Sequence, residues 1–272
     1  MWRDEALCYN QSVKFVIGNW KMNPSSFAEA KRIITVVKKN IGKHPHARLR
    51  GQAKVVICPP ALFLASLVEL TKNTAIAVGG QDSYLSDEGA HTGETSPSAL
   101  RRLGAACVIL GHSERRAIGE SDTVIAQKVA SAVRNRLRVV LCVGERERDD
   151  TGAYFTEVKR ELRASLEKFP RSEIKRLVVA YEPVWAIGAK AIRAAKPEDF
   201  REMSVFIRRN LVDCFGKKSG LVIPILYGGS ADERNAEGFL REGGADGFLV
   251  GRASLDPQKF SAIIRVAESA RY

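Results

Sequence analysis

The chain has 272 residues, of which 45% are hydrophobic and 27% are charged, and its formal net charge is +12 at pH 7. This composition is typical of an ordered globular protein and argues against an intrinsically disordered one. No apolar run approaches the roughly 20 residues that a membrane-spanning helix needs.

The first residues, Met1 to Glu5, have neither a long apolar core nor the acid-free, Arg/Ser-rich character of a targeting segment. We therefore expect a cytoplasmic protein with no membrane partner. The length fits one large domain with one core.

The positive charge has two possible uses. The lysines and arginines that follow Pro24 are interleaved on an amphipathic segment whose apolar positions are Phe27, Ala30, Ile33, Ile34 and Val37. They do not alternate with aromatic residues, so a solvated helix face is favoured over a nucleic-acid surface. A positive field would also attract small anionic substrates to a cleft.

The five cysteines are odd in number and show no CxxC spacing, and three of them lie inside apolar runs. This pattern is typical of buried thiols in a reducing compartment. It predicts neither a disulfide framework nor a metal site.

Eight apolar runs, each followed by a segment with helical spacing, are predicted to be strands: Lys14–Gly18, Lys54–Cys58, Ile76–Gly80, Cys107–Leu110, Arg138–Val143, Leu177–Tyr181, Ile223–Tyr227 and Gly247–Val250. The runs are nearly continuously apolar, as expected for parallel strands that are covered on both faces. Helix starts are marked by pairs such as Ser26 and Glu29, which can satisfy two free amides reciprocally.

Eight such units without a Gly/Ser/Pro linker predict an α/β protein, a (β/α)8 TIM barrel in which residues 1–272 form a single domain and residues 1–12 are a short N-terminal extension. A doubly wound open sheet is the alternative. Its dinucleotide-binding fingerprint is missing after the first strand.

Reactive side chains follow several of these strands, and in such a barrel the carboxyl ends of the strands meet at one mouth. Asn19 and Lys21 are two residues apart, so on an extended strand end they would face the same side. A lysine there could stabilise a negative charge that develops on an oxygen. The alternative is a lysine that merely extends into solvent.

His112 lies between an apolar strand and a helix start. The positive end of the helix dipole disfavours the imidazolium form, so a neutral ring could donate a hydrogen bond to a carbonyl. A packed or capping histidine is the alternative.

Glu182 ends another apolar strand. Desolvation at the edge of an apolar pocket would make its carboxylate a stronger base. An exposed strand-end glutamate is the alternative. In the Pro/Trp-containing stretch that follows, Gly188 could present an amide to an anion.

Glycine-rich turns follow the last two strands, Gly228-Gly229-Ser230 and Gly251-Arg252-Ala253. Backbone amides at these two places form the recurrent phosphate site of such barrels. Ordinary tight turns would also use this composition, but their occurrence after both strands favours phosphate.

Five segments together resemble the triosephosphate isomerase family: Gly18 to Asn23, Gly111 to Arg116, Ala180 to Gly188, Tyr227 to Ser230 and Leu249 to Gly251. The matches run in family order over nearly the whole chain. The resemblance implies an intramolecular oxidoreductase that interconverts dihydroxyacetone phosphate and D-glyceraldehyde 3-phosphate through an enediolate, in glycolysis and gluconeogenesis. It implies no metal and no organic cofactor.

The resemblance also implies roles for particular residues. Glu182 would be the base that moves a proton between two carbons, and neutral His112 would polarise the substrate oxygens. Lys21 with Asn19 would stabilise the enediolate. Glu114, as the acidic partner of the lysine, and Ser113 would support this set, and the phosphate would be held by backbone amides of Gly188, Ser230, Gly251 and Arg252.

Gln81-Asp82 followed by Gly89 to Glu94 resembles the loop by which each family subunit reaches into its neighbour. Thr92 would then approach the neighbouring Asn19 and Lys21, which implies a homodimer. A loop that folds over its own barrel is the alternative.

The chain departs from the family pattern after Gly188, where Ala189-Lys190-Ala191-Ile192-Arg193 replaces the common Thr-Gly-Lys, and at Arg252, where many members have glycine. An isomerase of a four-carbon ketose phosphate would keep the catalytic set and alter loop contacts. A non-catalytic phosphate- or nucleic-acid-binding barrel would leave the joint presence of these side chains unexplained.

Overall fold

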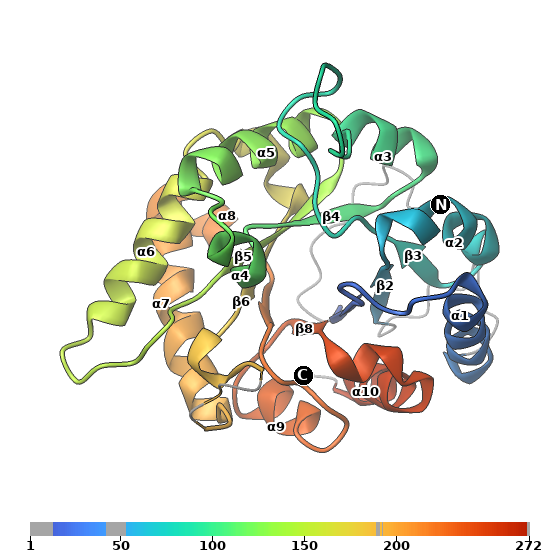
Figure 1. The fold of residues 1–272 in the computed structure, drawn as a ribbon. Helices are drawn as coiled ribbons and strands as arrows, with labels where there is room; N and C mark the ends of the chain where they lie inside the picture. Colours follow the sequence, from blue (N-terminus) through green and yellow to red (C-terminus); the bar gives the residue numbers. More distant parts are fainter. Residues whose placement is uncertain (1–12, 42–52, 189–190, 192, 271–272) are drawn as a thin grey trace.

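Eight parallel strands surrounded by helices make up the fold of the computed structural model, which describes residues 13–41, 53–188, 191 and 193–270 (Figure 1). The N-terminal extension expected at residues 1–12, and Ala189, Lys190 and Ile192 of the atypical loop, lie outside the described residues. The strands are β1 (Phe15–Asn19), β2 (Lys54–Cys58), β3 (Ile76–Val78), β4 (Cys107–Leu110), β5 (Arg138–Val143), β6 (Leu177–Tyr181), β7 (Ile225–Tyr227) and β8 (Gly247–Val250).

The strands form one sheet in the order β3-β2-β1-β8-β7-β6-β5-β4. The first and last strands of the chain are paired, with Phe15 opposite Gly247. The remaining seam, between β3 and β4, is joined by a bridge between Gly80 and Val108. The predicted (β/α)8 barrel is therefore confirmed.

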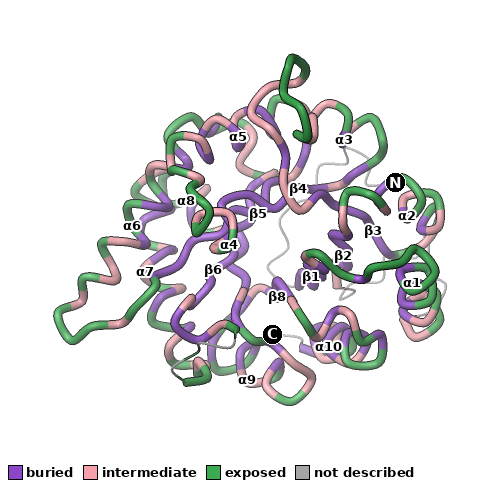
Figure 2. The backbone as a smooth tube through the Cα atoms, viewed as in Figure 1, coloured by how far each residue is buried: buried purple, intermediate pink, exposed green. Residues whose placement is uncertain are grey.

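The helices form the outer ring, and the longer ones bury one face toward the strands and turn the other to solvent (Figure 2). The α-helices are α1 (Phe27–Ile41), α2 (Leu64–Thr71), α3 (Pro97–Leu103), α4 (Ser113–Ala117), α5 (Asp122–Arg134), α6 (Ala153–Ser165), α7 (Pro197–Phe215), α8 (Lys217–Gly220), α9 (Ala236–Arg241) and α10 (Pro257–Ser269). Short 3₁₀ turns lie between them: η1 (Ala61–Phe63), η2 (Arg171–Arg176), η3 (Val184–Ala186) and η4 (Arg252–Leu255). No helix in the described ranges is long and apolar enough to cross a membrane.

Five of the eight strands have the predicted boundaries, and three differ at one or both ends. β1 starts one residue later and continues through Asn19. β3 stops at Val78, and Gly80 makes only the isolated bridge. β7 starts at Ile225 because Pro224 has no N–H to donate, although the Pro224 carbonyl still accepts from Val179 N at 2.9 Å.

Two apolar layers explain why the strands are apolar throughout. One layer fills the barrel interior and includes Ile17, Ile109 and Leu226. The other lies between the strands and the helices and includes Val16 and Val108. Alternate residues of each strand serve the two layers, as expected for a barrel whose interior is a packed core.

The cysteine and helix-face predictions also agree with the structure. Cys58, Cys107 and Cys142 are buried with free thiols, and Cys214 is partly buried and free. Helix α1 buries Ala30, Ile33, Ile34 and Val37 and turns most of its charged residues to solvent, whereas the fifth predicted apolar position, Phe27, is 37% exposed. At its start, Ser26 Oγ accepts from Glu29 N at 3.3 Å, which is half of the predicted reciprocal cap.

Candidate active site

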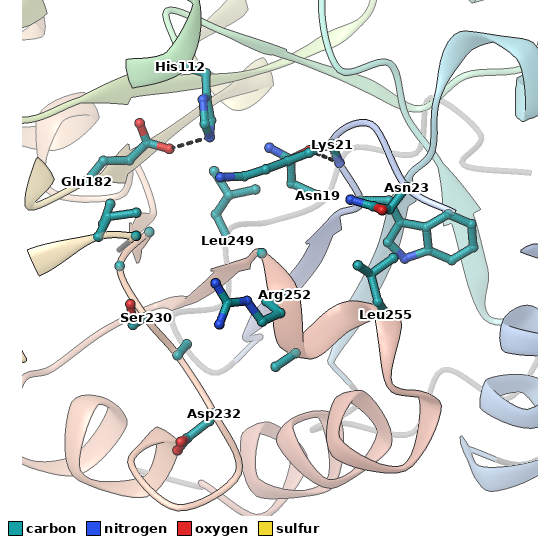
Figure 3. Close-up of a pocket in the computed structure, with 18 of the residues that line it drawn as sticks. Asn19, Lys21, Asn23, His112, Glu182, Ser230, Asp232, Leu249, Arg252 and Leu255 are labelled. Atoms are coloured by element: carbon teal, nitrogen blue, oxygen red, sulfur yellow. Dashed lines mark hydrogen bonds and ion pairs between the residues drawn. The ribbon is translucent and has the colours of Figure 1, made fainter. Parts of the chain in front are cut away.

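A cavity of about 610 Å³ opens at the carboxyl ends of the strands (Figure 3). Nine of the residues proposed from the sequence line it: Asn19, Lys21, His112, Ser113, Glu182, Gly188, Ser230, Gly251 and Arg252. Glu114 and Thr92 are not part of its wall. Residues from both halves of the chain therefore meet at one mouth, as the barrel topology requires.

Glu182 follows β6 and is only 2% exposed. Two glycines leave room for it. A Cβ at Gly144 would overlap the carbonyl of Glu182, and a Cβ at Gly228 would stand 2.9 Å from Glu182 Cγ. The carboxylate is thus a buried group in a fitted site, and the alternative of an exposed strand-end glutamate is wrong.

The protonation pattern of His112 follows from its contacts. Its Nδ1 accepts a hydrogen bond from Glu114 N at 3.2 Å and so caps α4. An imidazole nitrogen that accepts carries no proton, so the proton of the neutral ring lies on Nε2. Nε2 is 3.1 Å from Glu182 Oε1 and points into the cavity (Figure 3). The capping alternative is therefore correct, and the cap orients the ring.

Glu182 is held against the wall by other donors too. Its Oε2 accepts from Ser113 N at 2.9 Å. The Cys142 thiol faces the Glu182 carboxylate from the barrel interior. The pKa of this thiol is raised above its usual value, first by burial and then by the Glu182 charge. A neutral thiol, an imidazole N–H and an amide therefore surround the carboxylate.

Lys21 occupies the cavity through a turn and not through an extended strand. Its φ is +52°, in the left-handed region, and its N–H donates to Asn19 Oδ1 at 3.1 Å. The extended-strand argument for this pair is therefore wrong, although both side chains line the same wall. Lys21 Nζ lies 2.5 Å from Glu114 Oε1, as expected for its acidic partner.

Gln81 supports this strained turn, a role that the sequence did not reveal. Its amide Nε2 donates to the carbonyls of Lys21 and Cys58, at 2.7 and 2.9 Å. A left-handed backbone at a residue with a side chain costs on the order of 1–3 kcal/mol and persists where the surroundings fix it. The contact joins the loops that follow β1, β2 and β3.

The opposite side of the cavity consists of the glycine-rich turns. Gly229 must lack a side chain because a Cβ there would overlap the Tyr227 hydroxyl and ring. Gly251 and Arg252 stand at the start of η4, where backbone N–H groups lack acceptors within the turn. The φ angle of Arg252 is not in the left-handed region, so its backbone accommodates a residue with a side chain.

Glu145, also missed in the sequence, anchors the segment that carries Glu182. Its buried Oε1 accepts from the Tyr181 hydroxyl at 2.6 Å and from Trp185 Nε1 at 2.7 Å. Arg148 Nε donates to the same oxygen at 3.1 Å. One carboxylate therefore fixes the chain on both sides of Glu182. The only sequence signal was an acidic residue just after β5, at the same mouth.

Beyond this segment, Arg193 and Asp199 form a second anchor. Arg193 donates two hydrogen bonds to Asp199, at 2.6 and 2.9 Å, and its guanidinium lies 4.5 Å from the Trp185 ring centroid. The Asp199 pKa is lowered first by these hydrogen bonds. The end of the atypical loop is therefore attached to its beginning.

Thr92 lies on a loop that projects from the barrel ahead of α3 (Figure 1). The base of the loop is closed by Tyr84 N donating to the Thr95 carbonyl at 2.7 Å, and the Tyr84 and His91 rings make a tilted contact with their centroids 4.3 Å apart. Asn135 Nδ2 donates to Asp87 Oδ1 at 2.6 Å and ties the loop to α5. Thr92 itself is exposed and does not line the cavity.

Among the residues that the structure describes, no group of three or more His, Cys, Asp or Glu side chains could hold a metal ion. The polar groups of the cavity are hydrogen-bond donors, one imidazole and carboxylates. Such a set can transfer protons and stabilise an anion without further components.

Comparison with known proteins gives consistent matches. The family model described as triosephosphate isomerase matches residues 14–267. Triosephosphate isomerase of Roseiflexus castenholzii is 42% identical over 91% of this chain and 94% of its own length, and that of Saccharomyces cerevisiae is 42% identical over 90% and 94%. The crystal structure of triosephosphate isomerase from Bartonella henselae superposes with a TM-score of 0.79 at 33% identity, covering 93% of this chain and 98% of that one.

Proposed function

Because the chain belongs to the triosephosphate isomerase family, we propose that its cavity interconverts dihydroxyacetone phosphate and D-glyceraldehyde 3-phosphate by a proton transfer centred on Glu182. The observation that carries the mechanism is the contact of Glu182 Oε1 with His112 Nε2, at 3.1 Å. It sets a base and a neutral hydrogen-bond donor side by side on the wall opposite the glycine-rich turns.

In the direction from ketose to aldose, Glu182 takes a proton from the hydroxymethyl carbon of dihydroxyacetone phosphate. The electron pair of that C–H bond forms the carbon–carbon double bond of the enediolate, and the carbonyl oxygen takes up negative charge. The proton of the hydroxymethyl oxygen passes through His112 Nε2 to the former carbonyl oxygen, and Glu182 returns a proton to the neighbouring carbon, which yields the aldehyde. The same carboxylate serves both carbons, so no cofactor is consumed.

Before it can act, Glu182 must exchange its present donors for substrate. Its Oε2 accepts from Ser113 N and its Oε1 faces His112 Nε2. A substrate carbonyl that takes the His112 proton donor for itself frees one oxygen of the carboxylate. Substrate binding thereby activates the base.

The negative charge of the enediolate is met by three groups. His112 Nε2–H donates to the oxygens, Lys21 supplies a positive charge and Asn19 supplies an amide. Preorganised donors of this kind are worth roughly 10²–10³ in rate each. Glu114 holds the lysine in place at 2.5 Å.

Backbone amides of Gly188, Ser230, Gly251 and Arg252 hold the phosphate. A held phosphate keeps the enediolate from eliminating it, and closure of the Gly188 loop excludes water.

The working protein is a cytoplasmic homodimer, with the whole chain as one domain. Met22 and Leu62 are 93% and 88% exposed on the face that carries the loops after β1 and β2. A second copy of the chain would bury these exposed apolar side chains and would receive the projecting Thr92 loop, so it is favoured as the partner. In that dimer Thr92 approaches the neighbouring copy's Asn19 and Lys21.

A coupled assay tests the function. Purified protein is given D-glyceraldehyde 3-phosphate or a four-carbon ketose phosphate, with Glu182→Gln as the control. Efficient triose turnover that is lost in Glu182→Gln supports the assignment. Turnover of the four-carbon sugar alone would move the assignment to that substrate, and turnover of neither by folded protein would contradict isomerase activity.

A further inference from the structure

Two cations on the cavity wall, Arg252 and Lys259, have no carboxylate partner within the described part of the chain. Both side chains are exposed to the cavity and its mouth. Figure 3 shows the Arg252 guanidinium directed from η4 into the space that the other labelled residues surround.

The other charged groups on this wall are already engaged. Asp232 Oδ2 accepts from Arg234 Nη2 at 2.7 Å. Asp256 Oδ1 accepts from the amides of Gln258 and Lys259, at 2.9 and 3.1 Å, and so caps α10. Neither carboxylate therefore pairs with Arg252.

The positions of the Arg252 and Lys259 charges are unfavourable unless an anion lies near them. Lys259 lies in the first turn of α10, where the helix dipole disfavours a cation. Like charges that share one wall of a partly desolvated cavity repel each other. An anion that binds between them relieves both effects.

The space for such an anion lies over Gly251. This residue has no side chain, and an added Cβ would meet only Lys21 Cε, at 3.9 Å. Gly251 is thus flanked by Lys21 in space and by Arg252 in sequence. A tetrahedral dianion over Gly251 would meet a cation on either side.

We propose that the Arg252 guanidinium is a direct ligand of the substrate phosphate, with Lys259 adding its charge from α10. The inference rests on the proposed function, because it concerns the same phosphate site. The guanidinium matches two phosphate oxygens with two parallel N–H groups, and such charge-assisted bonds are about twice as strong as neutral ones. The site therefore selects the dianionic phosphate by charge and not by backbone amides alone.

The assignment has a kinetic signature. The phosphate keeps its charge throughout the isomerisation, so Arg252 contributes equally to substrate and transition-state binding. Such an interaction affects KM and leaves kcat unchanged. Because it is partly exposed, it weakens with ionic strength.

The test compares Arg252→Ala and Arg252→Lys with Arg209→Ala, which removes one exposed positive charge from α7, outside the cavity. For Arg252→Ala, KM for triose phosphate and the inhibition constant of inorganic phosphate should both rise roughly 10- to 100-fold, with kcat within about 2-fold of wild type. The lysine variant should be intermediate. Added NaCl should raise the wild-type KM more than that of Arg252→Ala.

Unchanged KM and phosphate inhibition in Arg252→Ala would overturn the assignment, and so would an equal rise in Arg209→Ala, which would indicate a general field effect. Wild-type protein without isomerase turnover would instead contradict the proposed function. In that case calorimetric titration of inorganic phosphate into wild type and Arg252→Ala decides the ligand role, since equal affinities would overturn it.

Discussion

Glu182 owes its position to residues that have no side chain. Gly144 and Gly228 lie on either side of it, and a single carbon added to either glycine would collide with Glu182. The sequence pattern places Gly228 in a turn and indicates no role for Gly144. Their shared function, space for a carboxylate, depends on β5, β6 and β7 being neighbours, which only the folded ring establishes.

Gly228→Ala should therefore damage catalysis more than binding. The new Cβ would lie 2.9 Å from Glu182 Cγ and 3.1 Å from the Tyr181 carbonyl, so the carboxylate must shift. A displacement near 1 Å costs on the order of 100-fold in rate. Steady-state kinetics should show that loss in kcat, in a variant whose melting transition remains cooperative. Near-normal kcat would mean that the carboxylate does not need this space.

Glu182→Asp tests how far the carboxylate must extend toward the substrate, and not how much room it has. Removing one methylene withdraws the carboxylate from the substrate carbon while the phosphate contacts stay. We expect kcat to fall by roughly 100-fold or more and phosphate inhibition to change little. A large loss of phosphate affinity with near-normal turnover would contradict the role given to Glu182.

Other supporting residues could not be found from local patterns. Gln81 and Glu145 act on residues far away in the sequence, Lys21 and Trp185. No spacing rule connects such pairs. The helix-dipole argument for His112 predicted a neutral ring but not which nitrogen carries the proton, since that depends on the Glu114 N to Nδ1 contact.

Among the secondary-structure elements, strand interiors were predicted well and their ends less well. The apolar runs identify strands because both faces are buried. Ends depend on individual groups such as the missing N–H of Pro224 and the closing bridge at Gly80. These ends position the site, since each side chain proposed as catalytic lies at a strand end or just after one.

Helix α6 contributes a buried carboxylate to this strand-end layer. Glu161 Oε2 accepts from Gly144 N at 3.0 Å, directly behind the Glu182 main chain. Burial raises the pKa of Glu161 to about 7, although Arg116, 3.5 Å away, opposes the shift. The folded protein therefore holds this proton more tightly than the unfolded chain.

The sign of the pH effect follows from that shift. The contribution of Glu161 to stability is complete below its unfolded pKa, 4.5, and is lost as the pH rises through about 7. Its size is up to about 3 kcal/mol. Glu161→Gln does not titrate, so urea unfolding between pH 4.5 and 8 should show a smaller decline than in wild type. Parallel curves for the two proteins would contradict this.

Glu157→Gln is the matched control. It lies one turn earlier on α6 and also accepts from a backbone amide after β5, Arg146 N, at 3.3 Å. Its stability should follow the wild-type pH dependence.

At the scale of the whole molecule, the sequence predicts the barrel because eight repeated units leave few alternative topologies. The charge was harder to interpret. Much of it lies on solvated helix faces such as that of α1, while Lys21, Arg252 and Lys259 line the cavity. Composition cannot separate these uses, because the difference is one of position.

The proposed dimer gives a prediction at this scale. Thr92→Arg places a charge at the tip of the projecting loop, so we expect dissociation into monomers and at least a roughly 10-fold loss of activity per site. Sedimentation equilibrium and kinetics measure both. Val205→Arg, at a 64% exposed position of α7, should stay dimeric and active. A fully active wild-type monomer would contradict the proposed assembly.

The most direct test of the mechanism follows D-glyceraldehyde 3-phosphate in deuterated water by NMR, for wild type and Glu182→Gln. A carboxyl that carries the proton between two carbons exchanges it with solvent, so wild type should form dihydroxyacetone phosphate with deuterium at the reacting carbon. Folded Glu182→Gln should form neither product nor exchanged substrate at a comparable rate. Turnover and deuterium uptake by Glu182→Gln within about tenfold of wild type would assign the base to another residue.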